Sequence, residues 1–351
     1  MANAIWDWEG RIGRRVRLRD LHILSAVVRW GSMAKAASHL AMSQPAVSEA
    51  IANLEDALRV RLLDRSSRGV EPTIYALALL KRGNVAFDEL RQGVRDIEFL
   101  ANPTVGEVRI ASGELLAAGL LPAAIDRVSR RYPQIVVDVV HENMATLEFR
   151  ELRERKVDLV LARMTGSVGE DDLDIEILFN DAHFVVAEAR SPWARRRKVA
   201  LAELVNEPWI FPRGQVVGAL IAEAFKTHGL KVPQERVRAG SVLLRKHLLA
   251  TGRFLTVLPD SVLRYNAKEW SLKALPVDLG VKPRPVAIVT LKNRTVGPVV
   301  QLFVEHLRAV AKTMFAPSGS GGARVSLRQP DATAIKDLPV SGASDEPFRY
   351  T

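Results

Sequence analysis

The chain has 351 residues, enough for two or three domains, and 50 Lys plus Arg against 40 Asp plus Glu give it a formal net charge of +10. This balance suits a polyanionic partner without requiring one. The absence of cysteine excludes disulfides and thiolate chemistry and fits a reducing compartment. The sequence has no apolar run near the roughly 20 residues that span a bilayer, and its start has no secretion signal. We therefore expect a cytoplasmic protein that makes no membrane contact.

Residues 1–18 form a basic leader that no pattern assigns to a fold. Its arginines are Arg11, Arg14, Arg15 and Arg17. Two interpretations stay open: an arm that follows a DNA backbone, or a solvated leader.

Residues 19–73 predict three helices followed by a basic hairpin. The first helix has apolar residues at helical spacing and ends at Gly31, where a positive φ is useful. Ser32 can cap a second, short helix, and Ser43 can cap a third helix that holds Pro45 in its first turn. Two helices joined by so brief a turn are typical of a helix-turn-helix, whose second helix can enter a DNA major groove. The alternative is a small three-helix unit without DNA binding.

Polar side chains gather where such a unit would meet DNA. Near the start of the third helix they can reach base edges, with glutamine suited to adenine, and the hairpin would carry guanidinium groups to phosphates. The candidate DNA-binding residues are Ser32, Lys35, Ser43, Gln44, Pro45, Ser48, Glu49, Arg65 and Arg68.

An ordered set of residues resembles the amino-terminal signature of the LysR-type transcriptional regulators. The set comprises Gly31 to Ala37 with Leu40, Ser43 to Ser48, Ile51, Leu54, Glu55, Leu58, Arg61 to Leu63, Arg65, Pro72 and Thr73. Two positions depart from the pattern, since Arg59 and Ala76 stand where the family usually has glycine. The resemblance implies sequence-specific binding to promoter DNA, control by a small-molecule effector, and contact with RNA polymerase.

Residues 74–101 predict one long helix. Apolar residues repeat every seven positions in two interleaved series, which forms an a/d seam, and the candidate dimerisation residues are Leu80, Phe87, Leu90, Val94 and Ile97. A helix packed on its own domain would bury the same stripe. The resemblance favours a linker helix that pairs two subunits of a homodimer or homotetramer. The two helix-turn-helix units of such a pair would then read two DNA half-sites.

From residue 104 to 315 strands alternate with helices, which predicts a parallel sheet covered on both faces. The resemblance implies a two-lobed, periplasmic-binding-protein-like effector domain, with lobe 1 at about 104–164 and 282–315 and lobe 2 at about 165–281. The fold class is therefore α plus α/β: a winged helix-turn-helix, a linker helix and this effector domain. Residues 316–351 are rich in Ser, Gly and polar residues and predict a disordered tail. The expected elements are strands at 105–111, 135–141, 158–162, 183–187, 209–211, 237–239, 255–258 and 286–291, and helices at 120–132, 146–156, 219–228, 242–251 and 296–315.

Loops that follow predicted strands are the candidate effector site, because a ligand between α/β lobes lies at the carboxyl ends of strands. These residues are Ser112, Gly113, Glu114, Asn143, Thr146, Arg163, Pro212, Arg213 and Gln215. Helix amino termini and the two arginines favour an anionic effector. Glu114 opposes that preference, so it could bind Arg213 or a sugar hydroxyl, or pair with Arg163 across an empty cleft.

Neither an enzyme nor a metal protein is expected. The seven histidines are scattered without ligand spacing, and the chain has no nucleophile elbow, P-loop or dinucleotide fingerprint. We therefore predict no catalytic residues, cofactor or metal. The acidic run at Asp171, Asp172 and Asp174 is interpreted as a solvated loop. A solute-binding protein of a transport system is the alternative function, and the helix-turn-helix argues against it.

Overall fold

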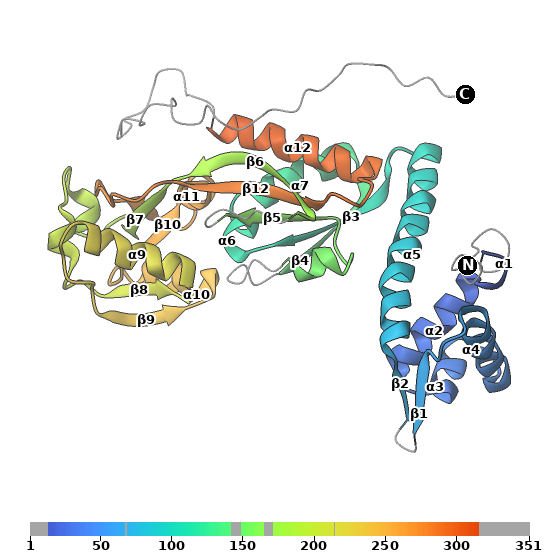
Figure 1. Cartoon of the computed structure of the whole chain (residues 1–351). Helices are drawn as coiled ribbons and strands as arrows, with labels where there is room; N and C mark the ends of the chain where they lie inside the picture. Colours follow the sequence, from blue (N-terminus) through green and yellow to red (C-terminus); the bar gives the residue numbers. More distant parts are fainter. Residues whose placement is uncertain (1–12, 67–68, 142–148, 165–170, 214, 316–351) are drawn as a thin grey trace. The chain divides into compact units, whose positions relative to one another are not determined.

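The computed structural model describes residues 13–66, 69–141, 149–164, 171–213 and 215–315 (Figure 1). The expected helix at 146–156 is represented by α8 (Arg150–Arg153), and its first residues lie outside the described part. The tail prediction for 316–351 also lies outside it. Among the described residues, no helix is long and apolar enough to cross a membrane.

The amino-terminal head contains α1 (Gly13–Arg15), α2 (Leu18–Trp30), α3 (Met33–His39), α4 (Gln44–Leu58) and the hairpin β1 (Leu63–Ser66) and β2 (Gly69–Pro72). The helix limits follow from local chemistry. Gly31 ends α2 in the left-handed conformation with φ 61°. The hydroxyl of Ser32 accepts a hydrogen bond from Lys35 N, and the hydroxyl of Ser43 accepts one from Ala46 N. The predicted capping residues are thus confirmed.

Arg59 occupies the turn after α4 with φ 54°. A non-glycine residue in the left-handed region is strained by its Cβ, which accounts for the family's usual glycine there. The turn nevertheless forms, because Glu55 Oε1 accepts hydrogen bonds from Leu62 N at 2.7 Å and Leu63 N at 3.2 Å. The entry to the hairpin is therefore held from α4.

The long helix α5 (Ile74–Ala101) begins at Thr73, whose hydroxyl accepts from Ala76 N. Its first half packs on the head, where Ala76 and Leu80 belong to the buried core and Phe87 packs against it. Leu80 is therefore unavailable to a second subunit, contrary to the seam expected from the heptads. The reason is that a helix drifts relative to a strict seven-residue repeat. Leu90, Val94, Ile97 and Leu100 remain 53%, 56%, 67% and 75% exposed.

Lobe 1 is a five-stranded sheet in the order β4-β3-β5-β12-β6, which joins β4 (Gln134–His141), β3 (Val105–Ser112), β5 (Leu159–Arg163), β12 (Arg284–Leu291) and β6 (Leu173–Asp181). Its β3 pairs parallel with β4 and β5, whereas β12 runs antiparallel to β5 and β6. The expected all-parallel sheet is corrected to a mixed one, because β12 returns from the second lobe against the direction of its neighbours. The edge strand β6 was not among the expected strands, and it moves residues 173–181 from lobe 2 to lobe 1.

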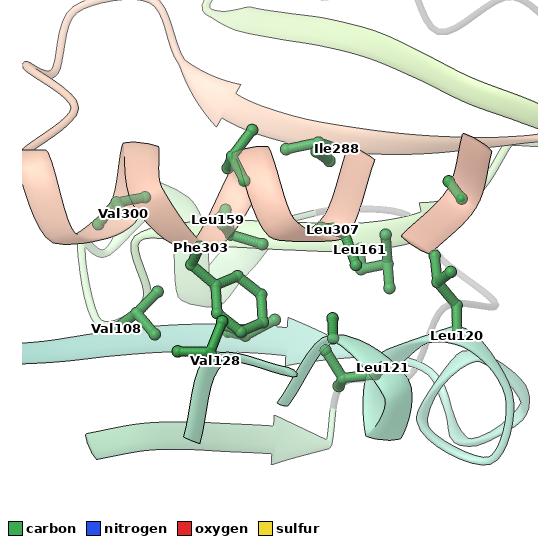
Figure 2. Close-up of a cluster of buried hydrophobic side chains, with 14 of the residues drawn as sticks. Val108, Leu120, Leu121, Val128, Leu159, Leu161, Ile288, Val300, Phe303 and Leu307 are labelled. Atoms are coloured by element: carbon green, nitrogen blue, oxygen red, sulfur yellow. The ribbon is translucent and has the colours of Figure 1, made fainter. Parts of the chain in front are cut away.

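The core of lobe 1 lies between this sheet and the helices α7 (Leu120–Arg131) and α12 (Pro298–Phe315). Figure 2 shows Phe303 of α12 among apolar side chains that both helices and strands β3, β5 and β12 contribute. Phe303 and Leu307 are fully buried. Burial of such a side chain contributes about 1.5–3 kcal/mol, so the carboxyl-terminal helix is an integral part of lobe 1.

Lobe 2 contains β7 (His183–Glu188), flanked by β10 (Thr256–Pro259) and β11 (Leu272–Ala274), and the parallel pair β8 (Trp209–Pro212) and β9 (Glu235–Ala239). Its helices are α9 (Gln215–Thr227), α10 (Val242–Ala250) and α11 (Asp260–Asn266). Fully buried Trp209 and Phe225 pack edge to face with ring centroids 5.5 Å apart. The chain crosses between the lobes from β6 to β7 and returns to β12, as expected from the two-lobed fold.

Candidate DNA-binding and effector-binding sites

The start of α4 presents a polar, exposed surface on the head. Gln44, Pro45 and Glu49 are exposed and Ser48 is half-buried, while Val47 on the opposite side is fully buried in the head core. Exposed Lys35 lies on the preceding α3. A helix with an apolar inner side and this polar outer side can enter a major groove without unfolding any of the head. Ser32 and Ser43 lie at the two helix starts and act as caps.

The hairpin β1–β2 forms the wing of the head. Arg65 is exposed on β1, and Arg68 lies outside the described residues. Val70 N donates to Gly31 O at 3.0 Å, which joins the wing to the end of α2. Gly69 has φ 131°, and a Cβ there would lie 2.8 Å from the same oxygen, so only glycine fits this close approach. The wing is therefore held in a defined position on the head.

The effector candidates of lobe 1 lie where β3 ends and α6 (Glu114–Ala117) begins. Ser112 is buried, and Glu114 reaches across to lobe 2, where its Oε1 accepts a hydrogen bond of 2.7 Å from Val242 N at the start of α10. The carboxylate thus satisfies one of the free amides of that helix. Glu114 has neither of the cationic partners that the sequence suggested.

Arg163 pairs with an aspartate of β6 and not with Glu114. Its Nη2 lies 2.5 Å from Oδ2 of fully buried Asp181, which also accepts hydrogen bonds from the backbone and hydroxyl of Ser261 in lobe 2. The suggested pair of Arg163 with Glu114 is therefore wrong, because Asp181 at the end of β6 lies beside Arg163. This cluster fastens the crossing between the lobes.

The remaining effector candidates are scattered. Pro212 is half-buried and Arg213 is exposed, and Arg213 N donates to Ala239 O at 3.1 Å. Asn143 and Thr146 lie outside the described residues. The backbone of Gln215 begins α9, and its side chain lies outside the description.

A buried cation, Arg245 on α10, was not identified from the sequence. It is only 3% exposed, and its Nε and Nη1 have no hydrogen-bond partner among the described residues. Burial lowers the pKa of Arg245, and the charge of Glu114 works to raise it. A buried donor without a partner is costly. Arg245 lies three residues after the amide that Glu114 binds, so it brings a positive charge close to the place where the two lobes meet.

His183 begins β7 directly after the crossing. It is 7% exposed, and neither ring nitrogen has a hydrogen-bond partner in the described part of the chain. Burial and the charges of Arg163 and Arg284 lower the pKa of His183 to about 4, against an opposing effect of Asp181. The imidazole is therefore neutral near pH 7.

A buried ionic cluster connects α5 with lobe 1. Asp88 is 2% exposed and accepts hydrogen bonds from Arg155 Nη1 at 2.9 Å and from Arg294 Nε at 2.8 Å and Nη2 at 3.1 Å. Arg294 also contacts Asp158, which Arg109 binds at 2.6 Å. Burial works to raise the pKa of Asp158, but the hydrogen bonds and charge of Arg109 and the charge of Arg294 hold that pKa below its usual range. Among the described residues, no group of three or more His, Asp or Glu could hold a metal.

Comparison with known proteins assigns the chain to a family. The model described as the LysR substrate binding domain matches residues 101–312, and the model of the bacterial regulatory helix-turn-helix protein, lysR family, matches residues 18–76. The transcriptional regulator GbpR of Azospirillum brasilense is 24% identical over 93% of this chain and 93% of its own. The transcriptional dual regulator GltC of Bacillus subtilis is 27% identical over 75% of this chain and 86% of its own.

The fold has experimental counterparts. A full-length OxyR variant from Pseudomonas aeruginosa matches 85% of this chain and 95% of its own with a TM-score of 0.57 and 19% identity. Because the two family models together match most of the described residues, the chain belongs to the LysR family. It is a DNA-binding transcriptional regulator with an effector-binding domain, and not an enzyme or a transport receptor. Its partners are promoter DNA, a small-molecule effector and further copies of itself.

Proposed function

We propose that the regulator senses a small anionic molecule, such as a carboxylate, that binds between the lobes. The observation that carries this proposal is Arg245, a guanidinium 3% exposed with two nitrogens free of hydrogen-bond partners in the described structure. A ligand carboxylate could accept a charge-assisted hydrogen bond from one of these nitrogens. Ser112 and the start of α10 would supply further donors from the two lobes.

Glu114 has a defined part in this proposal. Its carboxylate already accepts the hydrogen bond of the Val242 amide, and its charge opposes the lowering of the Arg245 pKa that burial causes. An anionic effector would replace Glu114 at the Val242 amide and bind the unpartnered nitrogens of Arg245. Replacement would break one hydrogen bond between the lobes and form others through the ligand. The ligand would therefore bind one arrangement of the two lobes more tightly than another, and this difference in affinity is what a population shift requires.

A panel of small carboxylates, such as benzoate, succinate and gluconate, tests this proposal through the shift in melting temperature of the full chain. At 100 times its dissociation constant a ligand stabilises by about 2.7 kcal/mol. We expect a carboxylate that stabilises the parental chain, no effect of its amide, and loss of the shift in Arg245→Gln. Arg197→Ala, which removes an exposed arginine of lobe 2 outside the candidate site, should retain the shift. A shift retained in Arg245→Gln would refute the assignment.

For DNA, we propose that the start of α4 reads bases and that the wing contacts phosphates. Exposed Gln44 supports the first role because its amide can form two hydrogen bonds with adenine. Gln44→Ala should cost about 1–3 kcal/mol on the cognate site and relax sequence preference. Gel-shift titrations against cognate and random DNA measure the difference, and equal losses on both would exclude a base contact.

We also propose that Leu90, Val94 and Ile97 form the surface of α5 on which two subunits pair. Their exposure supports this, since apolar stripes of this kind are rarely left to solvent. The proposed division places the head at residues 19–73, the linker helix at 74–101 and the effector domain at 104–315. A promoter-binding regulator would act in the cytoplasm, where its DNA is.

A further inference from the structure

We propose that four arginines before and at the start of α2 form a second DNA contact, on the flank of the recognition helix α4. We call Arg14, Arg15, Arg17 and Arg19 the basic arm. Three of them precede the first residue matched by the helix-turn-helix family model, residue 18. All four are exposed. None is among the residues assigned to base reading or to the wing.

The basic arm shares a hollow with α4. The hollow has a volume of about 520 Å³ and opens between the arm, the first turns of α2 and one side of α4. On α4 its wall includes Ala46, Glu49, Asn53 and Asp56, which recur at helical spacing and so lie on one side of that helix. This side adjoins the surface that carries Gln44, Pro45 and Ser48.

Two contacts hold the arm in this place. Arg15 Nη1 lies 3.0 Å from Asp56 Oδ2 near the carboxyl end of α4. Half-buried Val16 packs against the head core. The ion pair is exposed and contributes at most about 1 kcal/mol, so Val16 is the firmer anchor. Together they direct the neighbouring arginines toward the hollow.

DNA geometry then brings phosphates to the arm. A helix with its side chains is about 10–12 Å wide and the major groove is about 12 Å wide, so a recognition helix fills the groove from one sugar-phosphate strand to the other. Groups on the flank of α4 must therefore lie against one of the two sugar-phosphate backbones of the DNA. Guanidinium groups there fit phosphate oxygens in both charge and hydrogen-bond geometry.

The acidic residues of the hollow limit this contact without cancelling it. Four arginines and three acidic residues line the hollow, so its net charge is 4 − 3 = +1; the acidic residues are Asp20, Glu49 and Asp56. Burial raises the pKa of Asp20. Asp56 is paired with Arg15, so Arg14, Arg17 and Arg19 carry the charge that phosphates would meet.

The test measures how binding of the full chain to a random-sequence DNA duplex depends on salt, which requires no knowledge of the operator. Each phosphate contact contributes about 0.9 to the slope of log Kobs against log salt concentration. We expect the double variant Arg14→Ala with Arg17→Ala to reduce that slope by about 1.8, and the corresponding double lysine variant to retain most of it.

The matched control is Arg197→Ala with Arg236→Ala, which removes the same charge from exposed positions in lobe 2. It should leave the slope close to that of the parental chain. The proposal would be overturned if the salt slope of the Arg14→Ala, Arg17→Ala variant equalled that of the parental chain or decreased no more than that of the control. The leader would then be a solvated segment.

Discussion

Substitution of Asp88 by asparagine tests whether the buried ionic cluster fixes α5 to lobe 1. The change preserves shape but leaves Arg155 and Arg294 buried without their shared counter-charge; these arginines are 7% and 3% exposed. Removal of one partner from a buried ion pair typically costs about 3–5 kcal/mol. Arg155 keeps Glu89 and Arg294 keeps Asp158 as partners, so we expect a loss of about 3 kcal/mol, at the low end of this range, in the free energy of unfolding of the full chain.

The adjacent residue supplies the control. Glu89 Oε1 lies 2.9 Å from the same Arg155 Nη1 that binds Asp88 at 2.9 Å, but the Glu89 side chain is 38% exposed and that of Asp88 only 2%. Because water screens exposed pairs, Glu89→Gln should cost at most about 1 kcal/mol. Urea unfolding followed by circular dichroism compares the two midpoints. If Asp88→Asn costs no more than Glu89→Gln, burial does not determine the strength of this cluster and the reasoning is wrong.

Three further predictions concern His183, Arg59 and the exposed stripe of α5. The pKa of His183 is lowered from 6.5 to about 4, so as the pH falls the unfolded chain protonates this imidazole before the folded chain does. The free energy of unfolding should therefore drop by up to about 3 kcal/mol between pH 6.5 and pH 4. In urea titrations at several pH values, His183→Leu should flatten this pH dependence relative to the parental chain. Arg59→Gly should stabilise the head by about 1 kcal/mol by relieving the left-handed strain, whereas Arg59→Ala should bring no gain in melting temperature. Val94→Asp should shift sedimentation toward the monomer, and the same carboxylate placed off the stripe by Asn84→Asp should not; an unchanged oligomer in Val94→Asp would exclude the stripe from the subunit interface.

Elements governed by local chemistry were predictable from the sequence. The caps Ser32 and Ser43 act over three residues, and the apolar period of residues 74–101 extends over many turns, so neighbours in the chain determine these features. The edge strand β6 was missed because its outward positions, such as Asp174 and Glu176, are acidic and resemble a solvated loop. Its pairing with β12 depends on residues more than 100 positions away.

The buried charges were missed for a related reason. On a helix, Asp88 and Arg245 follow the pattern of a solvated surface, and nothing local indicates burial. Asp88 meets Arg294 across 206 positions in the sequence, and Glu114 meets Val242 across 128. The sequence predicted that Glu114 follows the strand at 105–111, as it does, but could not identify the partner of its carboxylate, because that partner is a backbone amide presented by tertiary structure.

The arrangement of β5 connects these two sets of charges. Asp158, which binds Arg109 and Arg294 beside α5, directly precedes β5, and Arg163, which binds Asp181 at the crossing, is its last residue. Five residues of strand span about 17 Å. The strand between them is fully buried from Leu159 to Ala162 and packed on both faces, so it has no room to deform. We infer that lobe 1 and the linker helix move as one body, and that an effector must act by changing how lobe 2 is held to it through Asp181 and Glu114.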